Sequence, residues 1–229
     1  MIQAILTDIE GTTTDIRFVH DVLFPYAQRH LGAFIEKRRD DPEVREILQA
    51  VKRHIGQPAA DEATALATLL KWMEEDSKIT PLKLLQGILW REAYERGDFR
   101  GHVYRDAYEK LQAWRAQGLA IYIFSSGSVE AQKLLFRHSA FGDLTALFSG
   151  YFDTQIGAKR EVEAYQKITA RIGLPAAHIL FLSDVKAELD AAQTAGLRTC
   201  WVLRSAPAPG LSEHPIVRSF GEIDLSLIS

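Results

Sequence analysis

The chain has 229 residues, 47% hydrophobic and 25% charged, which is ordinary for a globular protein and suits one large domain or one domain with an insert. Its net charge of −3, without a basic tail, argues against nucleic acid as the main partner, and no run approaches the roughly 18 apolar residues of a membrane span. The single cysteine, Cys200, allows no internal disulfide and favours a reducing, cytoplasmic setting. Because Cys200 lies in the apolar run TCWVL, we expect it in the core.

The N-terminal part combines one strand with a long helical block. The run IQAILTD predicts a short buried strand that ends at Asp8. The apolar spacing then becomes helical over residues 18–97, and the predicted helices are FVHDVLFPYAQRHLGAFIEKRR, DPEVREILQAVKRHI, ADEATALATLLKWMEEDS and TPLKLLQGILWREAYERG. We expect Thr80 to cap the fourth of these helices and Gly97 to end it.

Strands and helices alternate after residue 100. Predicted strands are LAIYIFSSGS, HILFLSD and RTCWVLR, with LFSGYFDT as a short strand or turn, and an amphipathic helix separates each from the next. The tail SAPAPGLSEHP is predicted as a surface loop. The alternation predicts an α/β fold, a doubly wound parallel sheet built from residues 1–17 and 101–229. Residues 18–100 are expected to form an inserted all-helical domain.

Polar side chains follow the predicted strands at the points where the strands end. Asp8 and Glu10 come after the first strand, and Asp184 follows HILFLS, with Glu188 one helical turn later. Further candidates are Ser125, Ser126 and Gly127 after the second strand and Lys159 before a helix. Because ligands bind beyond the carboxyl ends of parallel strands, we expect these residues to share one site.

This set of residues suits phosphoryl transfer. Asp8 and Asp184 could hold Mg²⁺ through oxygen, and Asp8 could attack phosphorus. Ser125, the amides of Ser126 and Gly127, and Lys159 could hold the phosphate oxygens of a small phosphate ester. Glu10 is placed to donate a proton to the leaving group. Each residue alone is more often structural, as a turn cap or a surface lysine, so the prediction rests on their joint occurrence.

The same segments resemble the four motifs of the haloacid-dehalogenase-like superfamily of phosphotransferases. The matching stretches are DIEGT, IYIFS ending at Ser125, Lys159, and FLSDVKAE with Asp184 and Glu188. The resemblance covers nearly the whole chain. It implies a Rossmann-like core with a helical cap inserted after the first motif, one Mg²⁺, and Asp8, Glu10 and Asp184 as the metal-associated acids. At the Glu10 position the superfamily usually reaches the metal through the main-chain carbonyl.

Glu10 stands where most members of the superfamily carry Asp, and this departure narrows the resemblance. Together, DIEGTTT, YIFSSGSVEAQKLLFRHS and FLSDVKAELDAA resemble the enolase-phosphatases, or acireductone synthases, of methionine salvage. That resemblance implies enolisation of 2,3-diketo-5-methylthiopentyl-1-phosphate and then its dephosphorylation to 1,2-dihydroxy-3-keto-5-methylthiopentene. It also implies that Ser125, Ser126 and Lys159 bind the substrate phosphate.

Several points stay open at this stage. The enolisation base is Glu10 or a residue of the cap, and Glu188 has no assigned role. A general small-molecule phosphatase or phosphonate hydrolase remains an alternative on the same fold, and a magnesium-binding regulatory module is an alternative of another class. We expect a monomer, because no apolar heptad is long enough for a coiled coil.

Overall fold

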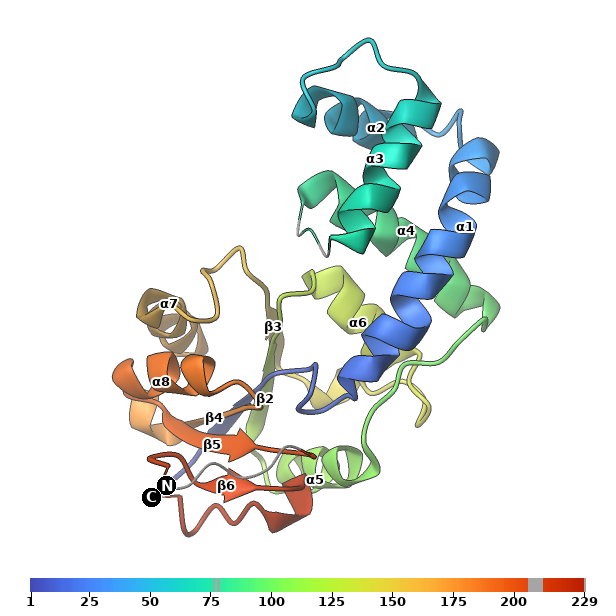
Figure 1. Cartoon of the computed structure of the whole chain (residues 1–229). Coiled ribbons are helices and arrows are strands. Elements are labelled where there is room, and N and C mark those ends of the chain that lie inside the picture. The colour runs from blue at the N-terminus through green and yellow to red at the C-terminus, as the bar shows by residue number, and fades with distance from the viewer. Residues whose placement is uncertain (76, 78, 206–211, 229) are drawn as a thin grey trace. The chain divides into compact units, whose positions relative to one another are not determined.

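The computed structural model describes residues 1–75, 77, 79–205 and 212–228 (Figure 1). The chain divides into two compact units, which we call the core unit, Met1–Ile16 with Arg100–Ser229, and the helical unit, Arg17–Phe99. Each boundary lies one residue before the position expected from the sequence. Within the described part of the chain, no helix is both long and apolar enough to span a membrane.

The core unit is built on a six-stranded, fully parallel sheet with the strand order β3-β2-β1-β4-β5-β6. Its strands are β1 (Ala4–Thr7), β2 (Ala120–Phe124), β3 (Gly150–Phe152), β4 (Ile179–Ser183), β5 (Arg198–Val202) and β6 (Ile216–Val217). The chain runs from β1 outward to β3, then returns across β1 to β4 and continues to β6. This order confirms the predicted α/β fold with a doubly wound parallel sheet.

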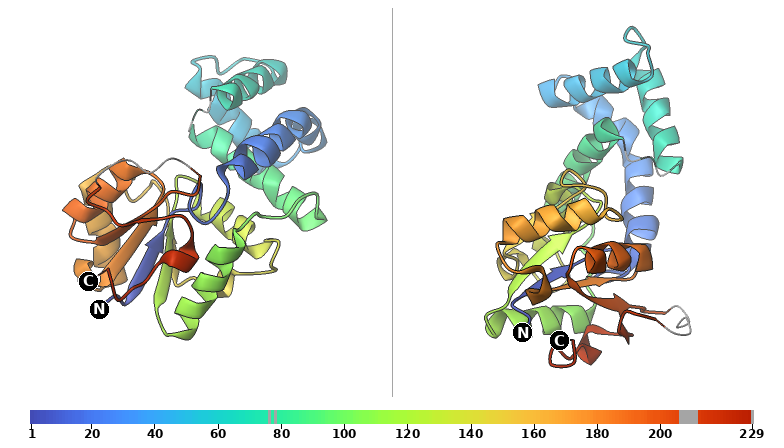
Figure 2. Two further views of the ribbon diagram at one scale, coloured as in Figure 1. Left: turned by 60° about the horizontal axis from the view of Figure 1, so that its bottom comes forward. Right: turned by 90° about the vertical axis from the view of Figure 1, so that its left-hand side faces the viewer.

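Helices cover both faces of this sheet. They are α5 (Arg105–Ala116), α6 (Val129–Arg137), α7 (Val162–Ile172) and α8 (Lys186–Thr194), with short 3₁₀ segments at Thr145–Leu147, Ala176–His178 and Phe220–Glu222. Figure 2 (left) shows α8 and α5 on opposite sides of the strands. Because both faces are covered, every residue of β1 and β4 is buried, as the continuous apolar runs AILT and ILFL require.

The described residues of the helical unit form four α-helices: α1 (Phe24–Lys37), α2 (Pro42–His54), α3 (Glu62–Glu74) and α4 (Thr80–Arg96). Local chemistry sets their ends. Asp41 caps α2 by accepting a hydrogen bond from the Glu43 amide at 2.9 Å, and Gly97 ends α4 in the left-handed region at φ 78°. Their apolar faces pack into one cluster that includes Leu31, Val51 and Leu85, so this unit has its own core.

Some local expectations differ from the structure. Ile79, with extended backbone, occupies the position before α4, so Thr80 is the first helical residue and not the cap. The first predicted helix is divided, because Phe18–Leu23 forms a π-helix before Pro25 enters the first turn of α1. The strand β6 was not expected. Part of the predicted loop SAPAPGLSEHP, residues 206–211, lies outside the described residues. Cys200 is fully buried, as expected, and burial followed by the charge of Glu222 raises its pKa to about 12.

Candidate active site

Three neighbouring strands end level with one another and carry the first group of candidate residues. Thr7, the last residue of β1, is paired with Ile123 of β2 and with Leu182 of β4. The residues that come just beyond these ends are Asp8, Ser125 and Asp184. The Asp8 amide also donates to the Leu182 carbonyl at 2.9 Å, which extends the β1–β4 ladder by one bond. The sheet therefore brings the three side chains to one edge.

Asp8 is buried in an ion-pair cluster. The ammonium group of Lys159 lies 2.6 Å from Asp8 Oδ1 and 2.7 Å from Glu188 Oε2, and all three side chains are at most 10% exposed. The backbone amide of Ile9 also donates to Asp8 Oδ1, at 2.8 Å. Asp8 is thus fixed in orientation, and Lys159 connects the first, third and fourth sequence motifs at a single point.

Glu10 points to the second motif. Ser125 Oγ donates to Glu10 Oε2 at 3.0 Å and accepts from the Gly127 amide at the same distance. Ser125 is fully buried, Gly127 is half-buried, and Ser126 is exposed in the loop between them. The hydroxyl of Ser125 therefore links the proposed proton donor to the loop that is expected to bind phosphate.

Asp184 is held by the turn that follows Asp8. Thr12 Oγ1 accepts from the Asp184 amide at 3.0 Å and lies 3.4 Å from Asp184 Oδ1, to which it donates. Gly11, at φ 78°, faces the same carboxyl group so closely that an added Cβ would lie 2.2 Å from Asp184 Oδ2. This position requires glycine both for its backbone conformation and for the space beside Asp184.

The carboxyl groups of the site lie close enough together for the charge of one to raise the pKa of another. Burial and then the charge of Asp8 raise the pKa of Asp184 to about 7, and the same two causes raise the pKa of Glu10 and of Glu188. Burial alone would lower the pKa of Lys159, but the charges of Asp8 and Glu188 outweigh it and raise that pKa. Two carboxyl groups thus pair with one ammonium group, and among the described residues the other two have only its charge nearby to offset their mutual repulsion, which is an environment that a divalent cation would stabilise.

The donors fit Mg²⁺ in number and type. Within the described residues, no three His, Cys, Asp or Glu side chains form a set that could hold a metal ion. The side chain of Glu10 is turned toward Ser125, which donates a hydrogen bond to its carboxylate. Asp8 and Asp184 would supply the two carboxylates. Magnesium keeps several water ligands and takes one or two carboxylates together with substrate phosphate, so such a set is sufficient.

Two side chains in this network have contacts that the sequence did not reveal. Glu188 accepts from Ser183 Oγ at 2.9 Å as well as pairing with Lys159, and Thr12 is fully buried against Asp184. The spacing of Glu188, one helical turn after Asp184, signals only that it faces the same edge. Its pairing with Lys159 joins residues about thirty positions apart in the chain, and local sequence does not show that.

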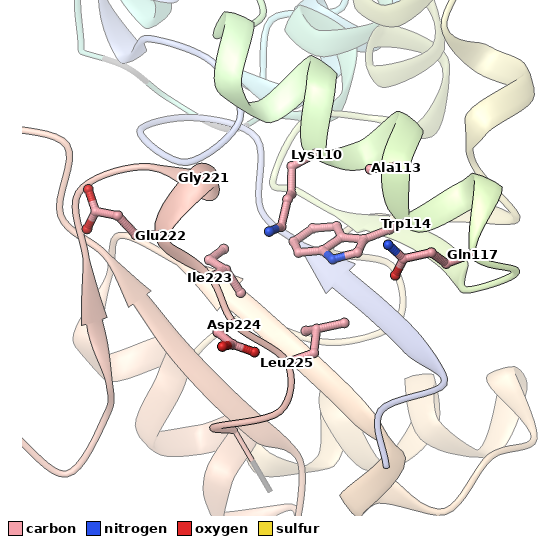
Figure 3. A pocket seen from close by; sticks show the side chains of 9 residues that line it. All are labelled: Lys110, Ala113, Trp114, Gln117, Gly221, Glu222, Ile223, Asp224 and Leu225. Carbon is pink, nitrogen blue, oxygen red and sulfur yellow. The ribbon is translucent and has the colours of Figure 1, made fainter.

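The core unit also contains a cavity that is lined by other residues. It has a volume of about 400 Å³ and lies between α5 and the C-terminal segment (Figure 3). Lys110 and Trp114 line it from the helix, and Glu222 and Asp224 line it from the segment. None of the predicted site residues contributes to it, so we assign the chemistry to the sheet edge.

Comparison with known proteins agrees with this geometry. The family model of haloacid dehalogenase-like hydrolases matches residues 2–196. Enolase-phosphatase E1 from Pectobacterium carotovorum is 54% identical over 225 residues, 98% of each chain. The same enzyme from Yersinia pestis is 54% identical over 229 residues, the whole of both chains.

Solved structures show the same fold. The UTR4 protein of Saccharomyces cerevisiae matches with a TM-score of 0.84 at 33% identity, over 97% of this chain and 100% of that chain. The L-2-haloacid dehalogenase of Xanthobacter autotrophicus matches with a TM-score of 0.57 at 18% identity, over 97% and 96% of the two chains, which shows likeness of fold alone. The chain therefore belongs to the haloacid dehalogenase-like hydrolases and, within them, to the enolase-phosphatase E1 family.

Proposed function

We propose that this chain enolises 2,3-diketo-5-methylthiopentyl-1-phosphate and then removes its phosphate to form the acireductone of methionine salvage. The identity of 54% to enolase-phosphatases over the whole chain supports the substrate. The observation that carries the chemistry is the position of Asp8, which is buried beside Lys159 at the end of β1 and level with the Ser125 loop.

In the phosphoryl-transfer step, a carboxylate oxygen of Asp8 attacks phosphorus, and the bond from phosphorus to the substrate oxygen breaks. Glu10 gives a proton to that leaving oxygen, a role that suits a carboxyl group whose pKa is raised by burial and by Asp8. Water then attacks phosphorus of the aspartyl phosphate while Glu10 takes a proton from that water, the bond from phosphorus to the Asp8 oxygen breaks, and inorganic phosphate leaves with the Asp8 carboxylate restored. Ser125, Ser126, the Gly127 amide and Lys159 are proposed to hold the other phosphate oxygens.

The enolisation step requires removal of a proton from the carbon next to a carbonyl. We propose Glu10 as the base, because it is the half-buried carboxyl group beside the Ser125 loop and has no ion-pair partner within hydrogen-bond distance among the contacts described. When Mg²⁺ is bound, it polarises a substrate oxygen and neutralises phosphate charge. Phosphatases of this family generally use Mg²⁺, and we propose Asp8, Asp184 and the Glu10 carbonyl as its ligands here.

We further propose that the helical unit is the cap and the core unit the catalytic domain. A cap excludes water from the reaction, which protects the enolised intermediate. A cytoplasmic location is supported by the single buried cysteine, and a monomer remains the prediction from sequence.

An assay that separates the two steps tests this function. Solvent deuterium incorporation, followed by NMR, reports enolisation, and release of inorganic phosphate reports the second step. The wild-type chain should show both with Mg²⁺, and Asp8→Asn should release no phosphate, whereas Asp224→Asn, which changes an exposed acid of the C-terminal segment, should behave as wild type. Phosphate release from many unrelated esters without enolisation would contradict the proposal.

A further inference from the structure

Arg204 lies two residues beyond β5 and is bound to the turn that follows Asp8. Its Nε and Nη2 atoms both donate to the Thr12 carbonyl, at 3.1 and 2.8 Å. Its Nη1 atom donates to Asp106 Oδ2 at 2.6 Å, and the guanidinium carbon stands 4.0 Å from the centre of the Tyr104 ring. Each of the three guanidinium nitrogens therefore donates a hydrogen bond, and the side chain is only 13% exposed.

The contacts of Arg204 fix position more than they supply charge to the site. Asp106 neutralises the guanidinium and is itself held by the Phe220 amide, which donates to its Oδ2 at 2.7 Å. The Tyr104 amide donates to the Thr13 carbonyl at 2.9 Å, so the residue after Thr12 in this turn is also held by a hydrogen bond. The Arg204–Asp106 pair therefore affects the active site by holding the Thr12 backbone in position.

Thr12 connects Arg204 to Asp184. Its carbonyl is held by Arg204, while its hydroxyl accepts from the Asp184 amide and donates to the Asp184 carboxyl group. A shift of the Thr12 backbone would therefore move the Asp184 carboxyl group relative to Asp8. Residues that orient metal ligands in this way typically change metal affinity or activity about 10–100-fold when they are removed.

We propose that Arg204 is a positioning residue for the metal site, which sets the separation of the Asp184 and Asp8 carboxyl groups through the Thr12 backbone. The inference rests on the proposed function in that it takes these two carboxyl groups as Mg²⁺ ligands. It assigns to Arg204 no contact with substrate.

The first test measures Mg²⁺ binding by isothermal titration calorimetry, without substrate. Arg204→Ala should weaken Mg²⁺ binding about 10–100-fold. Arg204→Lys should weaken it nearly as much, because one ammonium cannot reproduce the two donors to Thr12 and the third to Asp106. Arg198→Ala is the matched control, because it removes an exposed arginine at the opposite end of β5 and should leave affinity unchanged.

The second test distinguishes a positioning role from general damage to the fold. Millimolar guanidinium should restore much of the Mg²⁺ affinity of Arg204→Ala and none of that of Asp184→Asn, since only the first variant leaves a cavity of guanidinium shape. Asp106→Asn, which keeps Arg204 but weakens its anchor, should give a smaller loss of affinity than Arg204→Ala. Circular dichroism should show the same helix content in all variants.

Wild-type Mg²⁺ affinity in both Arg204 variants would overturn the inference, and so would full affinity in Arg204→Lys. Failure of the proposed function has a different signature. A wild-type chain that binds Mg²⁺ but neither enolises nor dephosphorylates the diketo phosphate would refute the function, while the affinities of the variants would still decide the role of Arg204.

Discussion

Replacement of Gly11 by alanine tests the geometry of the site most sharply, because the new side chain would both strain the backbone and collide with the Asp184 carboxyl group. Gly11 has φ 78°, and the left-handed conformation costs about 1–2 kcal/mol for a residue with a Cβ. The new Cβ would also lie 2.2 Å from Asp184 Oδ2 and 2.6 Å from Asp184 Cγ. These atoms belong to a side chain that can rotate, so we expect the fold to persist and the carboxyl group to move.

A matched variant isolates the second cost. Gly118 has φ 86°, and nothing lies within 4 Å of the position that its Cβ would take. Gly118→Ala should therefore lose the same 1–2 kcal/mol or so of unfolding free energy and nothing else. In melting temperature this corresponds to about 2–4 °C for each kcal/mol in a chain of this size.

The assay compares both variants by urea unfolding, Mg²⁺ titration and phosphate release. The two alanine variants should be similarly destabilised, but only Gly11→Ala should lose Mg²⁺ affinity and phosphate release, by about 10–100-fold as expected when a metal ligand is displaced. Gly11→Ala with normal Mg²⁺ affinity and normal turnover would refute the assignment of Asp184 to the metal site. Gly118→Ala with the same functional loss would show that backbone strain alone is responsible.

Other residues of the site give further expectations. Lys159→Ala should lower the unfolding free energy by about 3–5 kcal/mol, because it leaves two buried carboxylates without their cation, whereas Lys186→Ala removes an exposed pair and should cost under about 1 kcal/mol in the same urea titration. Mg²⁺ binding should weaken as the pH falls below about 7, since the pKa of Asp184 is raised to that value and only its ionised form binds metal; calorimetry in buffers of different ionisation enthalpy should detect the proton released. Glu10→Asp should slow enolisation and phosphate release unequally in the two-step assay, because the shorter side chain loses its reach to Ser125, and equal slowing of both steps would count against a special role for Glu10.

The periodicity of the sequence was sufficient to predict most of the fold. Long apolar runs such as AILT and ILFL and the amphipathic helices after residue 100 carry strong local patterns, and these elements lie where the patterns indicate. The strand β6 could not be predicted in this way, because two residues have no period and Ile216 and Val217 become a strand only by pairing with β5. The prediction that Thr80 caps α4 was wrong for a related reason. Thr80 has a side chain suited to a cap, but Ile79 has the extended backbone that the cap position requires.

The candidate site shows the same division between local and long-range information. Asp8, Ser125 and Asp184 could be named because each follows a recognisable strand, and the ends of adjacent parallel strands lie together. The direction of the Glu10 side chain depends on a contact with Ser125, more than a hundred residues away in the chain. The ion pair of Glu188 with Lys159 joins residues about thirty positions apart. Arg204 also follows a strand end, so the same rule could have marked it, but its bond to Thr12 required the three-dimensional structure.

A crystal structure of the chain with Mg²⁺ and orthovanadate, a mimic of phosphorus under attack, tests directly whether Asp8 is the nucleophile. We expect vanadium bonded to a carboxylate oxygen of Asp8, a cation bound by Asp8 and Asp184, and vanadate oxygens within hydrogen-bond distance of Ser125 and Lys159. Vanadate bound elsewhere, with the Asp8–Lys159 ion pair intact and no cation beside Asp184, would contradict this role of Asp8.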